Sequence, residues 1–497
     1  MTTSIAPRHS AAFLDGNDKR LLIDGRWIAG AGAPFETSDP ATGAVLATLS
    51  SAGADDVDAA VAAARAALHG KWRAWTPAAR ARVLWHIADA IDVHADELAE
   101  LETFDQGKSW ATSRFAEIPS AAEQFRYYAG WATKITGTTI APSITYQPPG
   151  KRVVAQTVRE PVGVVAAIVP WNSPMLMAAM KLAPALAAGC AVILKPAEDT
   201  SLTALRLGEL MVEAGVPAGV VGVLTGDGTV GARLASHRDV DKVTFTGSTA
   251  TGRALTAASG ASNLKRLTLE LGGKSPVLVF GDAELDTAVP GIARGIFSNC
   301  GQVCVAGSRV YAERSVYEQV VDGLAAAARS LRLGHGLDEG TDLGPLVSRR
   351  HRNTVASYVD DGVRGGATVV AGGRAVGEIG SFYEPTVVVD AGSDLPMMRE
   401  EIFGPVVTVT PFDDAEEVIA WANDTDYGLA ASVWTSNLSR AHRVSDAIRA
   451  GTVWINCHSY FAPELVKGGH KESGWGYENG AAGLENYLET KTVCLTV

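Results

Sequence analysis

Two short segments of the chain hold residues that are able to do covalent chemistry. Cys304 closes the run 297–304 (FSNCGQVC), and Glu270 lies within the run 269–274 (LELGGK). A cysteine thiolate attacks electrophilic carbon and a carboxylate activates water, so together they could form and then hydrolyse a thioester. Against this stands the usual behaviour of a free cysteine, which is to act as a small buried apolar residue.

Glu270 also has two interpretations. A carboxyl group between leucines is expected to be partly desolvated, which raises its pKa toward that of a useful general base. The alternative is a structural ion pair with Lys274 or Lys181.

Asn172 lies in a proline-bounded loop, within the run 170–174 (PWNSP), where a strand is predicted to end. Its side-chain amide is a donor of the kind that stabilises a developing oxyanion. Asparagine is also common in such turns for structural reasons, so this motif alone favours neither interpretation.

Two glycine-containing segments bear on a nucleotide site. Residues 226–231 (GDGTVG), which include Gly228, satisfy G-x-G-x-x-G after an apolar strand and before a helix. In a chain with 52 glycines, a plain tight turn explains this match nearly as well. Thr246, Gly247 and Ser248 end another strand and open a hydroxyl-rich helix, whose free backbone N–H groups suit a pyrophosphate.

These motifs resemble the active-site signatures of the NAD(P)-dependent aldehyde dehydrogenase superfamily, of the hydrolytic, non-acylating type, from about Leu21 to the C-terminus. The resemblance implies oxidation of an aldehyde to its carboxylic acid through a Cys304 thiohemiacetal and thioester. Glu270 would activate the hydrolytic water, which favours hydrolysis over transfer to coenzyme A. Asn172 and the backbone N–H of Cys304 would stabilise the oxyanion, and Lys181 would lie near the active site.

The resemblance also implies a set of cofactor-binding residues. Lys195 and Glu198 would grip the adenosine ribose, unless they are merely exposed charges on a loop. A carboxylate at Glu198 would repel a 2′-phosphate, so NAD is predicted over NADP. Glu401 would hold the nicotinamide ribose, and Phe403 would flank the nicotinamide ring. The other predicted cofactor-binding residues are Ile168, Trp171, Gly228, Thr246, Gly247, Ser248 and Leu271.

The substrate pocket implied by the resemblance is mainly apolar, and no Arg or Lys is expected there to bind a second carboxylate. An apolar or aromatic aldehyde is therefore predicted. Val466, Lys467 and Tyr477 replace the usual Pro, aromatic residue and Arg of the family, and we expect them to affect the pocket rim and subunit packing rather than the chemistry. The predicted pocket residues are Ser173, Met177, Met180, Phe297, Val303, Val305, Tyr460 and Phe461.

Composition excludes several other classes. A net charge of -12 over 497 residues, with no basic run, argues against nucleic-acid binding. Five scattered cysteines without a Cys-x-x-Cys pair predict neither a disulfide framework nor a metal site, and favour reduced thiols in the cytoplasm. Residues 174–194 are largely apolar, but a buried helix followed by a strand explains them better than a membrane span.

Short apolar strands alternate with helices at 162–169, 191–194, 220–224 and 242–245, which predicts an α/β fold with parallel sheets. The full prediction is two doubly wound parallel-sheet domains, one Rossmann-like and NAD-binding, the other catalytic, with a small β oligomerisation arm. The predicted boundaries are 1–141 and 161–272 for the NAD-binding domain, 142–160 for the arm, 273–472 for the catalytic domain and 473–497 for a C-terminal return segment.

The arm is predicted as a hairpin, with strands at 144–147 and 152–158 around a 148–150 turn. An isolated hairpin is marginal in water, so it is expected to pair with another subunit in a homodimer or homotetramer. The resemblance implies that the C-terminal stretch 486–497 takes part. The alternative is a hairpin lying on its own domain.

Two further functions remain open on the sequence. A cofactor-free thiol hydrolase would pair Cys304 with a histidine such as His458 or His470, but it leaves Ser248 and Glu401 unexplained. A non-catalytic binding protein on the same scaffold would be expected to have lost the catalytic groups.

Overall fold

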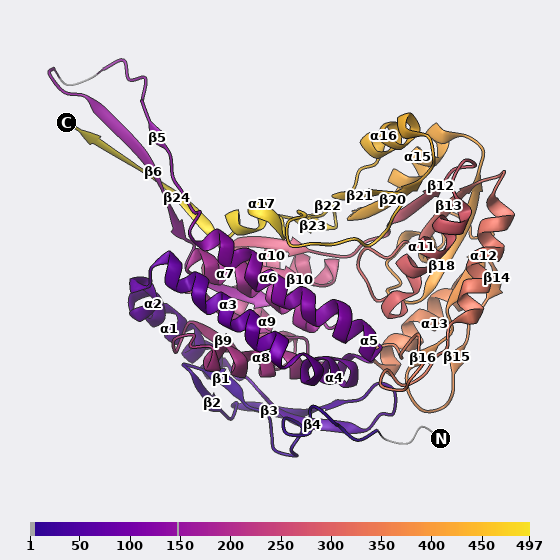
Figure 1. Cartoon of the computed structure of the whole chain (residues 1–497), viewed down its shortest axis with the longest axis horizontal. Helices are drawn as coiled ribbons and strands as arrows, with labels where there is room; N and C mark the ends of the chain where they lie inside the picture. Colours follow the sequence, from indigo (N-terminus) through magenta and orange to yellow (C-terminus); the bar gives the residue numbers. More distant parts are fainter. Residues whose placement is uncertain (1–4, 147–148) are drawn as a thin grey trace.

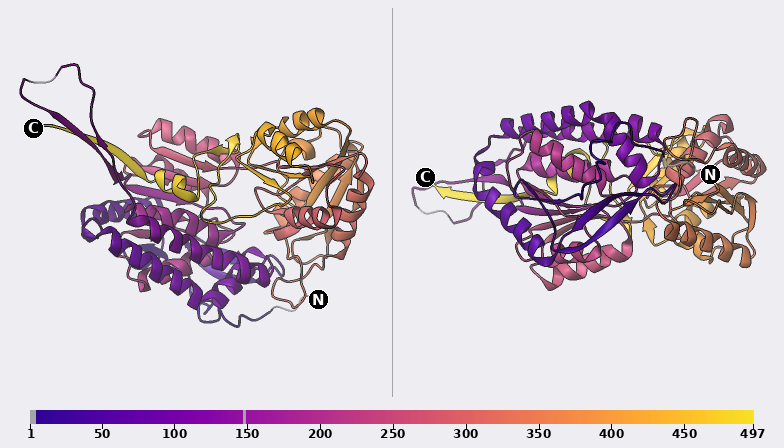
Figure 2. Two further views of the ribbon diagram at one scale, coloured as in Figure 1. Left: turned by 45° about the horizontal axis from the view of Figure 1, so that its top comes forward. Right: turned by 90° about the horizontal axis from the view of Figure 1, so that it is seen from below.

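The structure, a computed structural model, describes residues 5–146 and 149–497. Two large β-sheets organise it, and each has helices on both faces (Figure 1). The first sheet lies among the indigo and magenta helices, and the second lies among the orange ones. A narrow arm that includes the C-terminus projects from the first body, as both views in Figure 2 also show.

The first sheet has eight strands in the order β2-β1-β9-β8-β7-β10-β11-β23, and its five central strands are parallel. Parallel order at the centre, with helical crossovers, confirms the predicted α/β class. Each predicted strand lies within about two residues of an observed one. The strands are β1 Leu21–Ile23, β2 Arg26–Ile28, β7 Val164–Ile168, β8 Ala191–Lys195, β9 Val221–Val223, β10 Lys242–Thr246, β11 Arg266–Glu270 and β23 Gly474–Trp475.

The central strands are almost wholly apolar because both of their faces are covered. On β7, Val165 and Ala167 pack into one core, and Val164 and Ala166 pack into the core on the opposite face. The first core is covered mainly by α3 Pro77–Val93, α4 Ala95–Gln106, α6 Ile118–Ala132, α7 Pro174–Ala188 and α8 Leu202–Glu213. The second is covered by α1 Ala54–His69, α9 Gly228–Ser236 and α10 Thr249–Ala261.

The apolar run 174–194 is a buried helix followed by a buried strand, as predicted. Among residues 5–146 and 149–497, no helix is long and apolar enough to cross a membrane.

The second sheet has seven strands in the order β14-β17-β18-β13-β12-β20-β21, all parallel except β14. They are β12 Pro276–Val279, β13 Arg309–Glu313, β14 Thr368–Ala371, β17 Thr386–Val389, β18 Val406–Phe412, β20 Ala430–Trp434 and β21 Thr452–Ile455. Its covering helices are α11 Leu285–Phe297, α12 Tyr317–Ser330, α13 Arg349–Arg364, α15 Ala415–Asn423 and α16 Leu438–Ala447.

The remaining elements are short or peripheral. The helical ones are α2 Lys71–Ala74, α5 Trp110–Thr112, a π-helical turn Ser113–Glu117, a 3-10 turn Ser298–Gly301, α14 Pro396–Arg399 and α17 Gly480–Glu485. The paired strands are β3 Gly32–Ser38 with β4 Val45–Ser51, β15 Ala375–Val376 with β16 Phe382–Tyr383, and β19 Tyr427–Gly428 with β22 His470–Lys471.

The arm is a three-stranded antiparallel sheet in the order β24-β6-β5. Strand β6 (Val153–Pro161) pairs along its whole length with β24 (Leu488–Thr496), so the C-terminal stretch joins the arm of its own chain. The predicted first strand at 144–147 is not observed over 144–146, which form no strand, and β5 (Thr139–Ile140) pairs with the other edge of β6 instead. Gln147 and Pro148 lie outside the described residues.

The register explains this difference. Ile140 lies opposite Ala155, so continuing the antiparallel pairing would carry residues 144–146 beyond Val153, where β6 begins. No strand of the described part of the arm faces them there.

Candidate active site

A cavity of about 600 Å³ opens at the carboxyl ends of the parallel strands of the first sheet. This is where ligands bind in open α/β sheets. The chain after β7 contributes residues 170–173, the end of β10 contributes Thr246 with Gly247 and Ser248, and the chain after β11 contributes Leu271 with Gly272. Cys304, Glu401 and Phe403 line the same cavity.

Cys304 follows a tight turn at the end of α11. Asn299, Cys300 and Gly301 all have left-handed backbone conformations, with φ of 49°, 55° and 67°. A Cβ at Gly301 would lie 2.1 Å from the Gly404 carbonyl oxygen, so this close approach requires glycine. The turn brings the chain back toward the first sheet and leaves Cys304 in the cavity wall.

Asn172 is tied to that turn by two hydrogen bonds. Its Nδ2 donates to the Gln302 carbonyl oxygen at 2.8 Å, and Asn299 Nδ2 donates to the Asn172 carbonyl oxygen at 3.0 Å. Asn172 is buried and also lines the cavity. The structure therefore brings the predicted donor and the predicted nucleophile together.

Glu270 ends β11 and is buried, and neither of its carboxylate oxygens accepts a hydrogen bond from the described residues. Lys467 Nζ lies 3.6 Å from Glu270 Oε2, a contact of opposite charges slightly beyond hydrogen-bonding distance. Burial raises the pKa of Glu270 to about 7, with Lys467 acting in the opposite direction. Glu270 does not itself line the cavity, although Leu271 and Gly272 after it do.

The alternative prediction that Glu270 pairs with Lys181 or Lys274 is wrong. Lys181 pairs instead with Glu478 and donates a hydrogen bond to Thr244 Oγ1 at 3.3 Å. Lys274 is fully buried, and burial lowers its pKa to about 7. Lys181 does not line the cavity.

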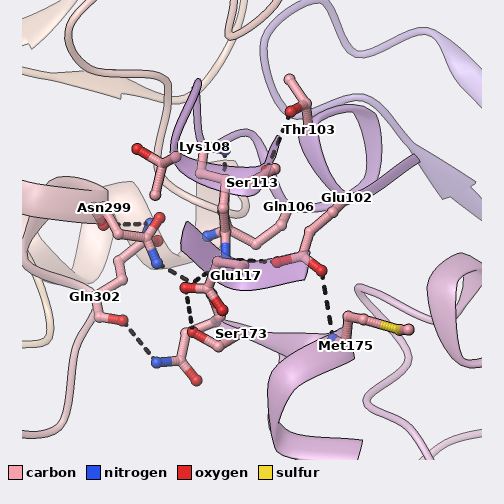
Figure 3. A network of polar contacts seen from close by, with 12 residues as sticks. Glu102, Thr103, Gln106, Lys108, Ser113, Glu117, Ser173, Met175, Asn299 and Gln302 are labelled. Carbon is pink, nitrogen blue, oxygen red and sulfur yellow. Dashed lines mark hydrogen bonds and ion pairs between the residues drawn. The ribbon is translucent and has the colours of Figure 1, made fainter. Parts of the chain in front are cut away.

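Ser173 is held by a buried ionic network behind the cavity (Figure 3). Its Oγ donates to Glu117 Oε1 at 3.0 Å, and Lys108 Nζ contacts both Glu117 at 3.3 Å and Glu102 at 2.8 Å. Glu102 in turn accepts from the Met175 backbone N–H at 3.4 Å, in the first turn of α7. The network fixes the start of α7, and with it the loop that carries Asn172.

The predicted cofactor residues divide into two groups. Trp171, Thr246, Gly247, Ser248, Leu271, Glu401 and Phe403 line the cavity. Ile168, Lys195, Glu198 and Gly228 are not among its lining residues.

In the first group, Glu401 is half-buried and accepts a hydrogen bond from the Gly273 N–H at 3.0 Å, and desolvation raises its pKa to about 7. The Phe403 ring packs edge-on against Trp171, with ring centroids 5.1 Å apart. Ser248 Oγ caps α10 by accepting from the Thr251 N–H, so its hydroxyl serves the helix in this structure.

In the second group, Ile168 packs in the core below the sheet. Lys195 Nζ lies 3.5 Å from Glu198 Oε2 at the end of β8. Glu198 is exposed but Lys195 is buried, so the alternative of two exposed loop charges does not describe Lys195. Gly228 opens α9, and a Cβ there would meet nothing within 4 Å.

At the β10 end of the cavity, one buried hydroxyl and the start of α10 are suited to contact a dinucleotide. Thr246 Oγ1 is buried without a hydrogen-bond partner among the described residues, and it lies in the cavity wall at the N-terminus of α10. An unpartnered hydroxyl is unfavourable unless a ligand or water satisfies it. Its position beside the start of a thirteen-residue helix suits an anionic ligand.

Six of the eight predicted pocket residues line the cavity: Ser173, Met177, Met180, Val303, Val305 and Phe461. The predictions for Phe297 and Tyr460 are wrong. Phe297 ends α11 and packs into the core of the second sheet, because it lies on the apolar face of that helix. Tyr460 is exposed, and its carbonyl oxygen accepts a hydrogen bond from Trp454 Nε1.

The expectations for Lys467 are also wrong. Lys467 is buried, lines the cavity and contacts Glu270, whereas Val466 and Tyr477 are exposed as expected of rim residues. The expectation of a pocket without a basic residue therefore fails. The sequence signal was the substitution itself: a lysine where an apolar residue is usual, close to glycines in a chain segment that returns to the first sheet.

The motifs missed several other lining residues. Phe115, Glu117, Leu176, Gln124, His351 and Asn479 line the cavity, and they lie on helices or loops without a local motif. The spacing of apolar residues on α6 and α7 indicates which faces are buried, but not which of them border a cavity.

No group of three or more His, Cys, Asp or Glu side chains in the described part of the chain could hold a metal ion.

Three comparisons place this geometry among known proteins. The model of the aldehyde dehydrogenase family matches residues 27–493. The chain is 46% identical over 502 residues to phenylacetaldehyde dehydrogenase of Pseudomonas fluorescens, covering 100% of both chains. It is also 46% identical over 477 residues to aldehyde dehydrogenase family 2 member B4, mitochondrial, of Arabidopsis thaliana, covering 95% of this chain and 87% of the relative. It superimposes with a TM-score of 0.96 on the NAD+ complex of an aldehyde dehydrogenase from Bacillus cereus, at 45% identity and 99% coverage of each chain. The chain therefore belongs to the aldehyde dehydrogenase family and is an NAD-using oxidoreductase that acts on aldehydes.

Proposed function

We propose that this enzyme oxidises an aldehyde to its carboxylic acid through a thioester on Cys304, which water activated by Glu270 then hydrolyses. The observation that carries the proposal is the shared cavity. Cys304 and Asn172 line it together with Thr246, Glu401 and Phe403 on the cofactor side.

In the first step, the Cys304 sulfur attacks the aldehyde carbon and forms the C–S bond of a thiohemiacetal. The developing oxyanion needs donors that are already in place. An amide N–H₂ has two hydrogens, so Asn172 Nδ2 has one left after its bond to the Gln302 carbonyl oxygen. The backbone N–H of Cys304 is the second donor in this proposal.

When bound, NAD would supply the hydride acceptor for the oxidation. Glu401 and Phe403 would hold and flank its nicotinamide end, and the start of α10 at Ser248 would face its phosphates. Lys195 and Glu198 would hold the adenosine ribose. We also propose NAD over NADP, because the Glu198 carboxylate would repel a 2′-phosphate.

Hydrolysis requires a base that is ionised near neutral pH. The Glu270 carboxyl, with a pKa raised to about 7 by burial, fits that task. Glu270 does not line the cavity, so we expect a water molecule to carry the proton between the reaction centre and the carboxylate. Catalytic hydrogen bonds commonly tighten only when substrate is bound.

We propose an apolar or aromatic aldehyde as the substrate. Leu176, Met177, Val303 and Phe461 give the substrate side of the cavity a largely apolar wall with adaptable methionine. The relative from Pseudomonas fluorescens is named for phenylacetaldehyde, an aromatic aldehyde.

A cofactor-free thiol hydrolase is less well supported. His458 uses both ring nitrogens on other partners, Ser432 Oγ at 3.0 Å and the Val305 carbonyl oxygen at 2.9 Å, and burial lowers its pKa to about 4. His470 is exposed on β22. Neither is placed as a base for Cys304. A non-catalytic binding protein leaves the grouping of Cys304 and Asn172 without a role.

We further propose a homodimer or homotetramer assembled through the arm, and a cytoplasmic location. All five cysteines are free thiols, which fits a reducing compartment.

The test is NADH formation by the purified protein with NAD and a panel of aliphatic and aromatic aldehydes. Cys304→Ala should abolish turnover. Cys300→Ala is the matched control, because Cys300 is buried, has a pKa raised by burial to about 12 and does not line the cavity. Absence of NADH from folded wild-type protein, with NADP and coenzyme A also tried, would contradict the proposal.

A further inference from the structure

Lys467 occupies an unusual place for a lysine. Its side chain is 7% exposed, lines the cavity beside Cys304, and lies 3.6 Å from Glu270 Oε2. Burying an ammonium without negative partners costs several kcal/mol or more, so such a position requires compensating charge. Three groups that can carry negative charge act on it, Cys304, Glu270 and Glu478, and the first two are the groups to which the covalent chemistry is assigned.

The backbone pins Lys467 in this position. Its N–H donates to the Glu478 carbonyl oxygen at 2.8 Å, and the Glu478 N–H donates back to the Lys467 carbonyl oxygen at 2.7 Å. The Glu478 side chain pairs with Lys181. Glu270, Lys467, Glu478 and Lys181 thus form a buried cluster of two acids and two bases that borders Cys304.

The pKa shifts of Lys467 and Cys304 are consistent with this buried cluster of charges. Burial by itself lowers the pKa of Lys467, but Cys304, Glu270 and Glu478 together raise it well above its usual value. Lys467 therefore stays protonated. Burial raises the pKa of the Cys304 thiol, Lys467 lowers it, and Glu401, Glu270 and Glu478 raise it. Among the charged groups that face Cys304, Lys467 is the one that favours the thiolate.

We propose that Lys467 is a positioning residue whose fixed ammonium stabilises negative charge on Cys304 and on Glu270 in turn. When the Cys304 S–H bond breaks, its proton passes to water and the sulfur becomes negatively charged, while Glu270 remains available as the base for the later hydrolysis. Lys467 lines the same cavity as Cys304 and lies 3.6 Å from Glu270 Oε2, so its ammonium is placed to act on the negative charge of either group. No electrons are transferred in this step.

The inference rests on the proposed thiolate chemistry of Cys304, and its test needs neither aldehyde nor NAD. The rate of Cys304 alkylation by iodoacetamide is measured against pH, with the Cys304 peptide quantified by mass spectrometry. Lys467→Met should shift the profile to higher pH by about one unit, which is a roughly tenfold slower reaction at neutral pH. Lys467→Arg keeps the charge and should restore the wild-type profile.

Lys471→Met is the matched control. It removes a cation from the same segment, where Lys471 Nζ donates to the carbonyl oxygens of Asn423 and Thr425 away from the cavity. Its alkylation profile should equal that of the wild type. If Lys467→Met does not fold, Lys467→Gln, which is neutral but can donate a hydrogen bond, gives the same comparison.

A neutral variant at 467 whose profile matches the wild type would overturn the inference. A shifted profile in a protein that makes no NADH from any aldehyde would instead support the role of Lys467 and reject the proposed oxidation.

Discussion

Glu270 makes the pH dependence of turnover predictable at the scale of a single residue. Because burial raises its pKa to about 7, it is protonated below that pH and carboxylate above it. Only the carboxylate can accept a proton from water. With saturating NAD and aldehyde, we expect the turnover number to rise with pH through about 7 and then level off.

Glu401 shares this titration range, because burial raises its pKa to about 7 as well. The variant Glu270→Gln separates the two carboxyl groups. The Glu270→Gln enzyme should have a low turnover number at every pH, without the rise through pH 7 expected of the wild type. Its thioester should accumulate on Cys304, and intact-protein mass spectrometry would detect it. A fast Glu270→Gln enzyme with the wild-type rise would assign the base elsewhere.

Local motifs predicted the residues that act within one strand end or one turn. Glycines, prolines or hydroxyl side chains next to Cys304, Asn172 and Thr246 indicate each of these sites. The backbone geometry of a turn or strand end constrains which residue types can stand there. Lys467 also stands next to glycines and replaces a usual aromatic residue, but neither feature predicts its contact with Glu270. Its partner Glu270 is far away in the sequence, and the contact exists only because the C-terminal segment returns to the first sheet as β23.

At the scale of an element, the turn between α11 and Cys304 sets the position of the nucleophile. Gly301 has a φ of 67°, and a Cβ there would meet the Gly404 carbonyl oxygen at 2.1 Å. Gly301→Ala therefore adds both backbone strain and a clash with backbone. We expect it to lower the thermal unfolding temperature and to reduce turnover about a hundredfold, as misplacement of a reacting group by about 1 Å does.

Gly260→Ala provides the comparison. Gly260 lies in α10 and is exposed, and a Cβ at this position would meet no other atom within 4 Å. Alanine should therefore leave activity unchanged and stabilise the helix by up to about 1 kcal/mol. Differential scanning calorimetry and steady-state rates measure both effects. Wild-type turnover in Gly301→Ala would mean that this turn does not position Cys304.

The sequence predicted strands well where both of their faces are buried. It predicted them poorly in the arm, where the choice of pairing partner decides which residues form a strand. The strands β7, β8 and β10 are continuous apolar runs because helices cover both faces, and such runs are visible in the sequence. The arm has no such signature. Residues 144–147 alternate like a strand, yet the partner of β6 on that side is Thr139–Ile140, and the other partner comes from the end of the chain.

At the scale of the whole molecule, the arm is the part whose shape is suited to contact with another subunit. Its three strands project from the body (Figures 1 and 2), and β24 pairs with β6 alone among the described residues, which leaves its other edge free. A free edge strand readily pairs with another chain. Ile140 and Leu495 expose apolar side chains on this small sheet, although single exposed apolar residues are ordinary.

Removing residues 489–497 should therefore convert the proposed dimer or tetramer into a monomer, as measured by light scattering after size exclusion. The cavity and its lining residues lie outside the deleted strand, so the monomer should keep Cys304 reactive toward iodoacetamide. Leu438→Ser, which changes an exposed leucine on α16 of the other body, should leave the mass unchanged. A truncated protein that keeps the wild-type mass would show that the subunits associate elsewhere, and β24 would then serve only to brace the arm of its own chain.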